Sequence, residues 1–394
     1  MPILVNLFHL RALRSAPFFL SGNLVNPPAS SFPNGAFPLL GPTAVRGYWV
    51  QPDPPRAYKM QWNLNIQRQL TNTLAITAAY VGAKGVHLPD GSDDGDMVPP
   101  QLVTRSADGH YVFPKVIQRI NPNYSQIQTT RWDGYSMYHG LQLNLVQRLN
   151  RNFSLQAVYA WSKSIDNGGI EYSNVEIAGQ MDNPWWFDNH LQKGLSDFNI
   201  PQHLGINFVW DVPSPKFNSV VPRFLLGGWE LTGIFSLQNG RPFSIRVPND
   251  VAGTGSNQVG RNGGGQRPDF NPNGGPGCTA GAVNANNPDN YIRVECFSFP
   301  APGTLGNLGR NTFRAPNQND FDFSLFKNNN VLGEKLKTQF RVETFNLFNH
   351  TNFTNGGQPF TPFNAQGQIV PANTRLTSTA TTSRQIQLAL KLIF

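Results

Sequence analysis

Large apolar residues occupy every second position in many short segments of this chain. In the last ten residues the apolar positions are Ile386, Leu388, Leu390, Leu392 and Phe394, and the residues between them are mostly polar. Successive side chains of a β-strand point to opposite faces, so this pattern predicts a strand with one apolar and one mostly polar face. A helix would instead place apolar residues three and four positions apart.

The same alternation predicts about ten strands along the chain. They cover residues 59–69, 73–82, 138–148, 153–162, 203–212, 227–238, 319–327, 335–346 and 384–394, with a less certain strand at 241–247. Residues 64–80 also align without a gap to residues 143–159, and each copy consists of a strand, a short polar turn and a second strand. Repeated hairpins of this kind favour an antiparallel meander.

The connections between these strands alternate in length when the uncertain strand is left out. The short ones lie near 70–72, 149–152, 213–226 and 328–334, and the long ones span 83–137, 163–202, 239–318 and 347–383. Short turns on one side and long loops on the other are typical of an outer-membrane barrel, whose apolar band a tilted ten-residue strand can cross. We therefore expect an all-β fold: a partial antiparallel transmembrane β-barrel with long extracellular loops.

A secreted soluble β-sandwich or propeller that binds carbohydrate is the alternative interpretation, and in it the apolar faces would pack on one another. Aromatic residues near the predicted strand ends favour the membrane, because they resemble the girdles at membrane interfaces. The outer girdle would contain Trp62, Tyr80, Tyr159 and Trp161, and the inner one Trp210, Trp229 and Phe394.

Composition supports strands joined by polar loops. Only 14% of the residues are charged, while 12% are aromatic, and there are 37 glycines and 32 prolines. The sequence contains no run of 18 apolar residues that would predict a transmembrane helix. The net charge of +8 comes from scattered Lys and Arg, so a basic surface or pore lining is favoured over nucleic-acid binding.

No pattern in the sequence indicates an enzyme. The seven His residues show no metal-ligand spacing, and neither a nucleophile–base set nor a pair of glycosidase carboxylates stands out. We therefore predict no catalytic residue, no cofactor and no metal. The acidic run 93–96 lacks the spacing of a calcium loop and is interpreted as a solvated turn, and the glycine-rich stretch 253–265 as a surface loop rather than a phosphate site.

Two loop features remain as candidate sites. Cys278 and Cys296 are 18 residues apart and match no zinc motif; in an oxidising compartment they predict a loop disulfide, with two free thiols as the alternative. Trp185, Trp186 and Asp188 form an acidic-aromatic patch that would suit a sugar or peptide ligand. Packing of the loop over the barrel mouth is the other explanation for this patch.

Several stretches carry a family resemblance. They are Gln61–Leu64, Tyr80–Gly85, Tyr138–Gln142, Tyr159–Asp166, Gly227–Gly233, Phe345–Phe353 and the terminal Phe394. From residue 45 to 394 the chain resembles the C-terminal barrel part of TonB-dependent outer-membrane receptors, in particular the Oar-like group. Residues 1–44 form a poorly defined N-terminal segment.

The resemblance implies a 22-stranded barrel in the cell outer membrane, plugged by an N-terminal domain, that imports scarce nutrients with energy passed through TonB. About ten strands without a plug predict a truncated form, for which TonB would be a partner only if the plug were supplied. His9, Arg11 and Arg14 interrupt the apolar N-terminus, so Met1 is not expected to be the true start.

The resemblance also implies two further partners. The terminal Phe394 resembles the signal read by the barrel-assembly machinery, and outer-membrane lipid would surround the strands. No motif identifies the transported ligand. An open sheet in lipid would leave edge N–H and C=O groups unpaired, so the strands are expected either to close as a small barrel or to await missing partner strands.

Overall fold

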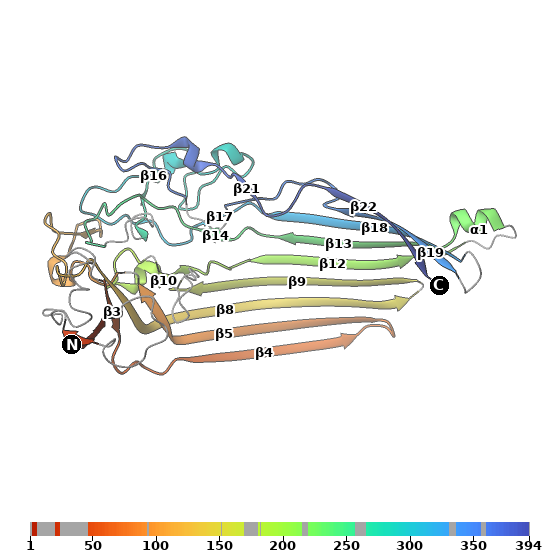
Figure 1. Cartoon of the computed structure of the whole chain (residues 1–394), viewed down its shortest axis with the longest axis horizontal. Helices are drawn as coiled ribbons and strands as arrows, with labels where there is room; N and C mark the ends of the chain where they lie inside the picture. Colours follow the sequence, from red (N-terminus) through yellow and green to blue (C-terminus); the bar gives the residue numbers. More distant parts are fainter. Residues whose placement is uncertain are drawn as a thin grey trace.

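The three-dimensional structure is a computed structural model. It describes residues 2–5, 20–23, 46–92, 94–150, 152–168, 180–181, 183–214, 220–256, 265–330, 336–355 and 360–393. Nine long strands lie side by side in one sheet, and a layer of loops is gathered at one end of it (Figure 1).

The nine strands form an antiparallel meander in which each strand pairs with the next along the chain. They are β4 (Tyr58–Gln69), β5 (Leu74–Ser92), β8 (Gln126–Asn150), β9 (Phe153–Asp166), β12 (Gln202–Asp211), β13 (Trp229–Gln238), β18 (Gln318–Asn330), β19 (Lys337–Phe345) and β22 (Gln385–Ile393). The all-β antiparallel fold predicted from the alternation is therefore confirmed, and each of the nine strands coincides with a predicted one.

Shorter elements accompany the sheet. Three strands extend it at the loop end: β3 (Arg46–Val50), β10 (Gln180–Met181) and β11 (Gly194–Leu195). The remaining strands form two-stranded pairs: β1 (Pro2–Val5) with β2 (Leu20–Asn23), β6 (Thr104–Arg105) with β7 (Tyr111–Val112), β14 (Pro242–Phe243) with β17 (Phe313–Arg314), β15 (Asp269–Phe270) with β16 (Phe297–Ser298), and β20 (Phe353–Thr354) with β21 (Ser378–Thr379). The 3-10 helices are Pro100–Leu102, Asn189–Gln192, Pro288–Asn290, Val294–Cys296 and Pro371–Thr374.

Connection length separates the two ends of the sheet, as the sequence predicts. The short connections and β22's C-terminal end lie at the right of Figure 1, and the long connections form the layer at the left. One short connection, between β12 and β13, holds α1 (Val220–Leu226), a helix that the strand pattern did not predict. No helix in the described ranges is both long and apolar enough to cross a bilayer.

The strand register places the apolar residues of neighbouring strands on one common face. Ile66 on β4 stands opposite Ala78 on β5, which in turn stands opposite Leu143 on β8. The same row continues through Tyr159, Leu204 and Leu237 on the next three strands. A strand shifted by one residue would reverse its faces, so this register is what makes the apolar face continuous.

This apolar face is not covered by protein. Leu64 is 63% exposed and Leu390 is 67% exposed, while Leu155 in the middle of the sheet is half-buried by its own neighbours. Within the described ranges, no second layer packs on it. A soluble sandwich or propeller would bury these side chains, so that alternative is wrong, and the outward side chains are suited to contact hydrocarbon.

The sheet is open at both edges. Among the described residues, β4 pairs with β5 alone at one edge and β22 pairs with β19 alone at the other. Because nine strands alternate in direction, β4 and β22 both run toward the short-turn end. Direct pairing between them would be parallel, whereas single-chain bacterial outer-membrane barrels have even numbers of antiparallel strands.

Two details of the sequence prediction are corrected. β5 and β8 extend well past the predicted ranges 73–82 and 138–148, toward the loop end of the sheet. Polar and glycine residues interrupt the alternation there, although the backbones of the two strands still pair. The uncertain strand at 241–247 is reduced to β14, which pairs with β17 outside the main sheet. The repeated segments form matching hairpins, β4–β5 and β8–β9, as predicted.

Candidate functional site in the loop layer and on the inner face

The face of the sheet opposite the apolar one is polar over most strands. On β4 it presents Gln61, Asn63, Asn65 and Gln67, and on β22 Gln385, Gln387 and Lys391, all exposed. A polar face on this side and an apolar face on the other are the two surfaces of a membrane barrel wall. Any solute that enters from the loop end would meet this inner face, so the candidate site comprises the loops and the polar wall below them.

A pocket of about 350 Å³ lies on the inner face where β18, β19 and β22 meet the loops. Its lining includes Asp320 and Asp322 from β18 together with Asn346, Thr381 and Thr382. The backbone N–H of Asn346 donates to Oδ1 of Asp322 at 2.9 Å, so one of the two carboxylates helps to hold the start of a long loop. Phe345 also lines the pocket, so its surface is a mixture of polar and apolar groups.

One apolar cluster, the first loop core, joins the two C-terminal long loops. Its fully or nearly fully buried members include Phe243, Ile245, Tyr291, Ile292, Phe313 and Phe360. The stacked rings of Phe243 and Phe313 have centroids 5.4 Å apart, and Phe360 lies 5.1 Å from Phe243. The long loops therefore have a packed core of their own and form a defined surface above the sheet.

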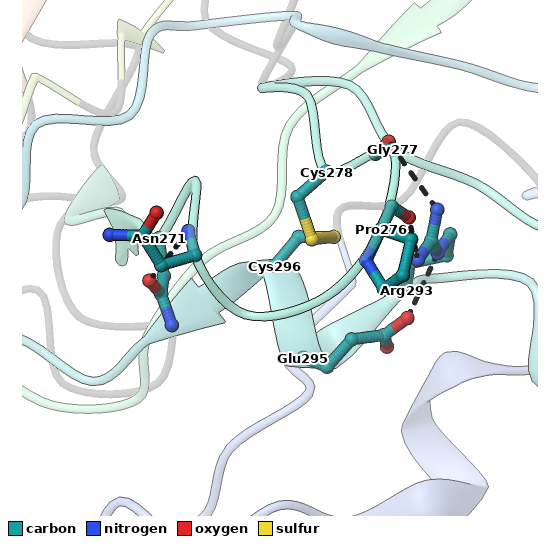
Figure 2. The surroundings of a disulfide bond; sticks show 8 residues. Asn271, Pro276, Gly277, Cys278, Arg293, Glu295 and Cys296 are labelled. Carbon is teal, nitrogen blue, oxygen red and sulfur yellow. Dashed lines mark hydrogen bonds and ion pairs between the residues drawn. A yellow bond between two sulfur atoms is a disulfide. The ribbon is translucent and has the colours of Figure 1, made fainter.

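The cysteine pair is part of this core. Cys278 and Cys296 form a disulfide with their Cα atoms 5.3 Å apart, and Cys296 is completely buried (Figure 2). Beside it, Nη2 of Arg293 donates to the carbonyl of Pro276 at 2.9 Å, and Nε donates to Glu295 at 2.9 Å. The bond and the guanidinium both tie the segment 276–278 to the segment 293–296, which is the arrangement expected for a loop in an oxidising compartment.

A second loop core joins the first two long loops to the loop between β13 and β18. Its buried members are Met97, Val98, Phe113, Trp185, Trp186, Ala252 and Leu305. Nε1 of Trp185 donates to the carbonyl of Val98 at 3.0 Å. The Arg131 guanidinium lies 3.8 Å from the ring of Trp186 and donates to its carbonyl.

These contacts change the interpretation of the acidic-aromatic patch. Trp185 is only 4% exposed and Trp186 only 8%, so in this conformation both indoles pack against other loops. Their burial agrees with the packing explanation offered from the sequence. Contact of these residues with a ligand stays an untested prediction.

Asp188 has several partners in the same layer. Its carboxylate accepts hydrogen bonds from Tyr111 Oη at 2.5 Å and from the backbone N–H of His190 at 2.9 Å. Burial by itself would raise the pKa of Asp188, but these hydrogen bonds outweigh burial and lower it. The carboxylate therefore stays charged and connects the β6–β7 hairpin to the loop that follows β9.

The acidic run at 94–96 is a correction to the solvated turn expected from the sequence. Asp94 and Asp96 are buried, and Nη2 of Arg119 lies 2.7 Å from Asp94 and 3.4 Å from Asp96. Asp96 also accepts the backbone N–H of Asn121 at 2.8 Å. The ion-pair partner, Arg119, lies about 25 residues away in sequence. The acidic run by itself therefore gave no indication of this partner.

His110 connects two long loops by ion pairs. Its Nδ1 lies 2.8 Å from Asp108 and its Nε2 lies 2.9 Å from Asp269. Burial would lower the pKa of His110, but hydrogen bonds to the two carboxylates outweigh it and raise the pKa. The imidazolium therefore holds the β6–β7 hairpin against the loop that contains β15.

Metal sites and the chain termini complete the account of the predicted residues. In the part of the chain that the structure describes, no group of three or more His, Cys, Asp or Glu side chains is placed to hold a metal ion. Phe394 lies outside the described residues, as does most of the segment 1–44. The division at residue 45 therefore stays a prediction.

Comparisons with known proteins agree with this geometry. The family described as "Outer membrane beta barrel domain" matches residues 6–387. No curated relative matches the chain.

Three solved structures are similar at low identity. The outer membrane transporter YddB from Escherichia coli is 11% identical, with a TM-score of 0.41 over 88% of this chain and 34% of its own. The FrpB iron transporter from Neisseria meningitidis is 11% identical, with a TM-score of 0.40 over 88% of this chain and 33% of its own. The ferric preacinetobactin receptor BauA from Acinetobacter baumannii is 9% identical, with a TM-score of 0.39 over 85% and 29%. This chain thus spans about a third of the length of each.

Proposed function

Because this chain belongs to the outer-membrane β-barrel domain family and is an outer-membrane protein, we propose that it is the C-terminal part of the barrel of a TonB-dependent receptor for nutrient uptake, of the Oar-like group. The proposal assigns the chain a transport role and no enzymatic reaction. It rests on the sequence stretches that resemble this receptor group and on the architecture of the sheet.

The odd number of long strands among the described residues is the observation that carries the proposal. Nine alternating strands leave β4 and β22 pointing the same way, so they cannot pair antiparallel to close a barrel. In hydrocarbon, each unpaired edge N–H or C=O costs several kcal/mol. Further strands between the two edges would let every pair be antiparallel, and a larger receptor barrel supplies them.

The loops fit a receptor. Four long connections lie at one end of the sheet and build two packed cores there, so they present a defined surface to the outside. The polar inner face and the pocket beside Asp320 and Asp322 lie directly below this surface. A solute captured by such loops would next meet a hydrophilic wall, as uptake requires.

Two partner assignments follow from the proposal. The C-terminal strand that ends at Phe394 would be read by the barrel-assembly machinery during insertion. TonB would act through a plug domain, which a complete receptor carries ahead of its barrel, and therefore not through the strands described above.

A gain-of-function experiment tests the proposal. The reading frame upstream of Met1 would be joined in frame, and uptake of labelled ferric siderophores, cobalamin and oligosaccharides would be compared in cells with and without TonB. We expect the extended chain to import one of these solutes only when TonB is present, and the 394-residue chain to import none. A 394-residue chain that by itself forms a closed, heat-modifiable, ion-conducting barrel would contradict the proposal.

A further inference from the structure

A groove of about 380 Å³ opens on the outer face of the sheet, at the end nearest the loops. Its lower part, which is farther from the loops, is lined by Tyr80, His139, Leu141 and Trp161. The register places these side chains on the apolar, outward face. Its upper part, which is nearer the loops, is lined by Lys163 and Arg314 together with Leu195, Asn199 and Pro201. The groove therefore begins on the membrane-facing surface and ends at the base of the loops.

The lower part of the groove is built from aromatic rings. Tyr80 Oη and His139 Nδ1 are 2.7 Å apart, and their rings stack with centroids separated by 6.1 Å. Trp62 lies beside them against Gly82, where a Cβ would come within 2.2 Å of the indole. Trp161 is 59% exposed on the same face. Aromatic rings of this kind concentrate at the level of lipid headgroups.

The upper part of the groove is cationic. Lys163 is exposed and stands opposite His139 across the β8–β9 pair. Phe313 and Ala315 point into the first loop core, so Arg314 between them points to the opposite side, toward the groove. Nη1 of Arg314 donates to the carbonyl of Gly240 at 3.3 Å, which fixes the guanidinium near the groove wall.

The groove has a one-sided charge. Its lining, which consists of described residues, includes the basic residues Lys163 and Arg314 and no Asp or Glu. On a surface that faces the bilayer, the molecules available to fill an apolar groove are lipids. Basic side chains just outside the hydrocarbon favour anionic headgroups, and Arg and Lys are both suited to phosphate.

We propose that this groove binds a phosphate-bearing lipid of the leaflet nearest the long loops. The acyl chains lie along Leu141 and Trp161, and a headgroup phosphate lies between Lys163 and Arg314. The site is separate from the inner face, so it would hold a structural lipid rather than a transported solute. The inference depends on the chain's place in the outer membrane and not on the identity of the nutrient.

Native mass spectrometry of the full chain, extracted from outer membranes in detergent, tests the inference. The probe is lipid A with two phosphates, compared with the same lipid after enzymatic removal of both phosphates. For the wild-type chain we expect saturable binding of the phosphorylated lipid. For Lys163→Gln combined with Arg314→Gln, loss of two charges predicts binding weaker by roughly ten- to thirtyfold.

Arg68→Gln is the matched control, because Arg68 is an exposed cation on the same outward face at the opposite end of β4. It should bind like the wild type. Lys163→Gln alone leaves the Arg314 hydrogen bond intact and should give an intermediate loss of lipid binding. This single variant keeps the inference testable if the double variant folds poorly. Equal binding by all variants, equal loss in Arg68→Gln, or equal affinity for the dephosphorylated lipid would each overturn the inference.

Discussion

At the scale of single residues, exposure has an unusual meaning in this chain. Leu388 is 66% exposed and its neighbour Gln387 is exposed as well, yet the two point to opposite faces of β22. In water, an exposed Leu tolerates most substitutions. In a bilayer, the same side chain lies in hydrocarbon and the adjacent one in water.

This difference predicts opposite outcomes for two adjacent substitutions. Leu388→Arg should destabilise the protein in phospholipid vesicles by about 2 to 4 kcal/mol, the cost of Arg near the bilayer midplane. Gln387→Arg should have little effect, because Gln387 points inward and stands opposite Glu343. Denaturant unfolding in vesicles, followed by tryptophan fluorescence, measures both. Equal stability of the two variants would contradict the assignment of faces.

Asp96 predicts a pH effect within the loop layer. Its Oδ2 is buried without a hydrogen bond, and burial is the main reason that its pKa rises from 3.8 to about 6, against the opposing effects of the Asn121 N–H and Arg119. A carboxyl with a raised folded-state pKa binds its proton more tightly in the folded state. Its stabilising contribution is therefore complete below about pH 4 and is lost as the pH rises through about 6.

Asp96→Asn should remove this loss. The amide oxygen can still accept the Asn121 N–H, while Arg119 keeps Asp94 at 2.7 Å. Hydrogen exchange of the segment 94–127, corrected for intrinsic rates, should show greater protection than the wild type at pH 7 and nearly equal protection at pH 4. A variant that is less protected at pH 7 would show that the Asp96 charge stabilises this loop.

At the scale of elements, the strands and the loops are held by different forces. The strands pair by backbone hydrogen bonds and place their apolar side chains in lipid. The loops pack two apolar cores of their own, and the first of these contains the Cys278–Cys296 disulfide. We therefore expect loop stability to be separable from sheet stability.

Replacing both cysteines by serine tests this separation. Closing a loop of 18 residues stabilises a fold by about 3 kcal/mol in the chain-entropy account. The double variant should be cleaved faster by protease within 278–296 on intact cells, while the strands of the sheet stay in the membrane fraction. Wild-type protein treated with a reductant should behave in the same way. Loss of the strands from the membrane fraction in the variant would mean that the sheet depends on this loop.

At the scale of the whole molecule, strand direction decides what can close the sheet. β4 and β22 run the same way, and both are edges among the described residues. If the chain is part of a larger barrel, these edges stay apart or pair with other strands. If it closes by itself, they must meet in parallel.

Cross-linking distinguishes these two cases. Asn65 on β4 and Gln387 on β22 both face inward, and each would be changed to Cys in a background without Cys278 and Cys296. A short bismaleimide should give no intrachain cross-link in membranes. A control pair, Gln156→Cys with Asn207→Cys on the paired strands β9 and β12, should cross-link efficiently. An efficient β4–β22 product would show that the nine strands close directly.

The alternation in sequence determined the nine strands, their faces and the separation of short from long connections. These follow from local rules, because side-chain direction reverses at each residue and the alternation itself marks where most strands begin and end. The repeat at residues 64–80 and 143–159 likewise became two equivalent hairpins. The local pattern was therefore enough to predict a strand wherever one of its faces meets lipid.

Tertiary structure alone decided which distant residues meet. Three features join segments far apart in the chain. They are the pairing of Arg119 with Asp94, the burial of Trp185 and Trp186, and the meeting of Arg314 and Lys163 in the lining of one groove. Such contacts leave no periodic signal, because loop conformation depends on packing between loops rather than on neighbours in sequence. The parts of β5 and β8 nearest the loops were also decided by tertiary structure. Backbone pairing extends both strands there, beyond the end of the alternation in sequence.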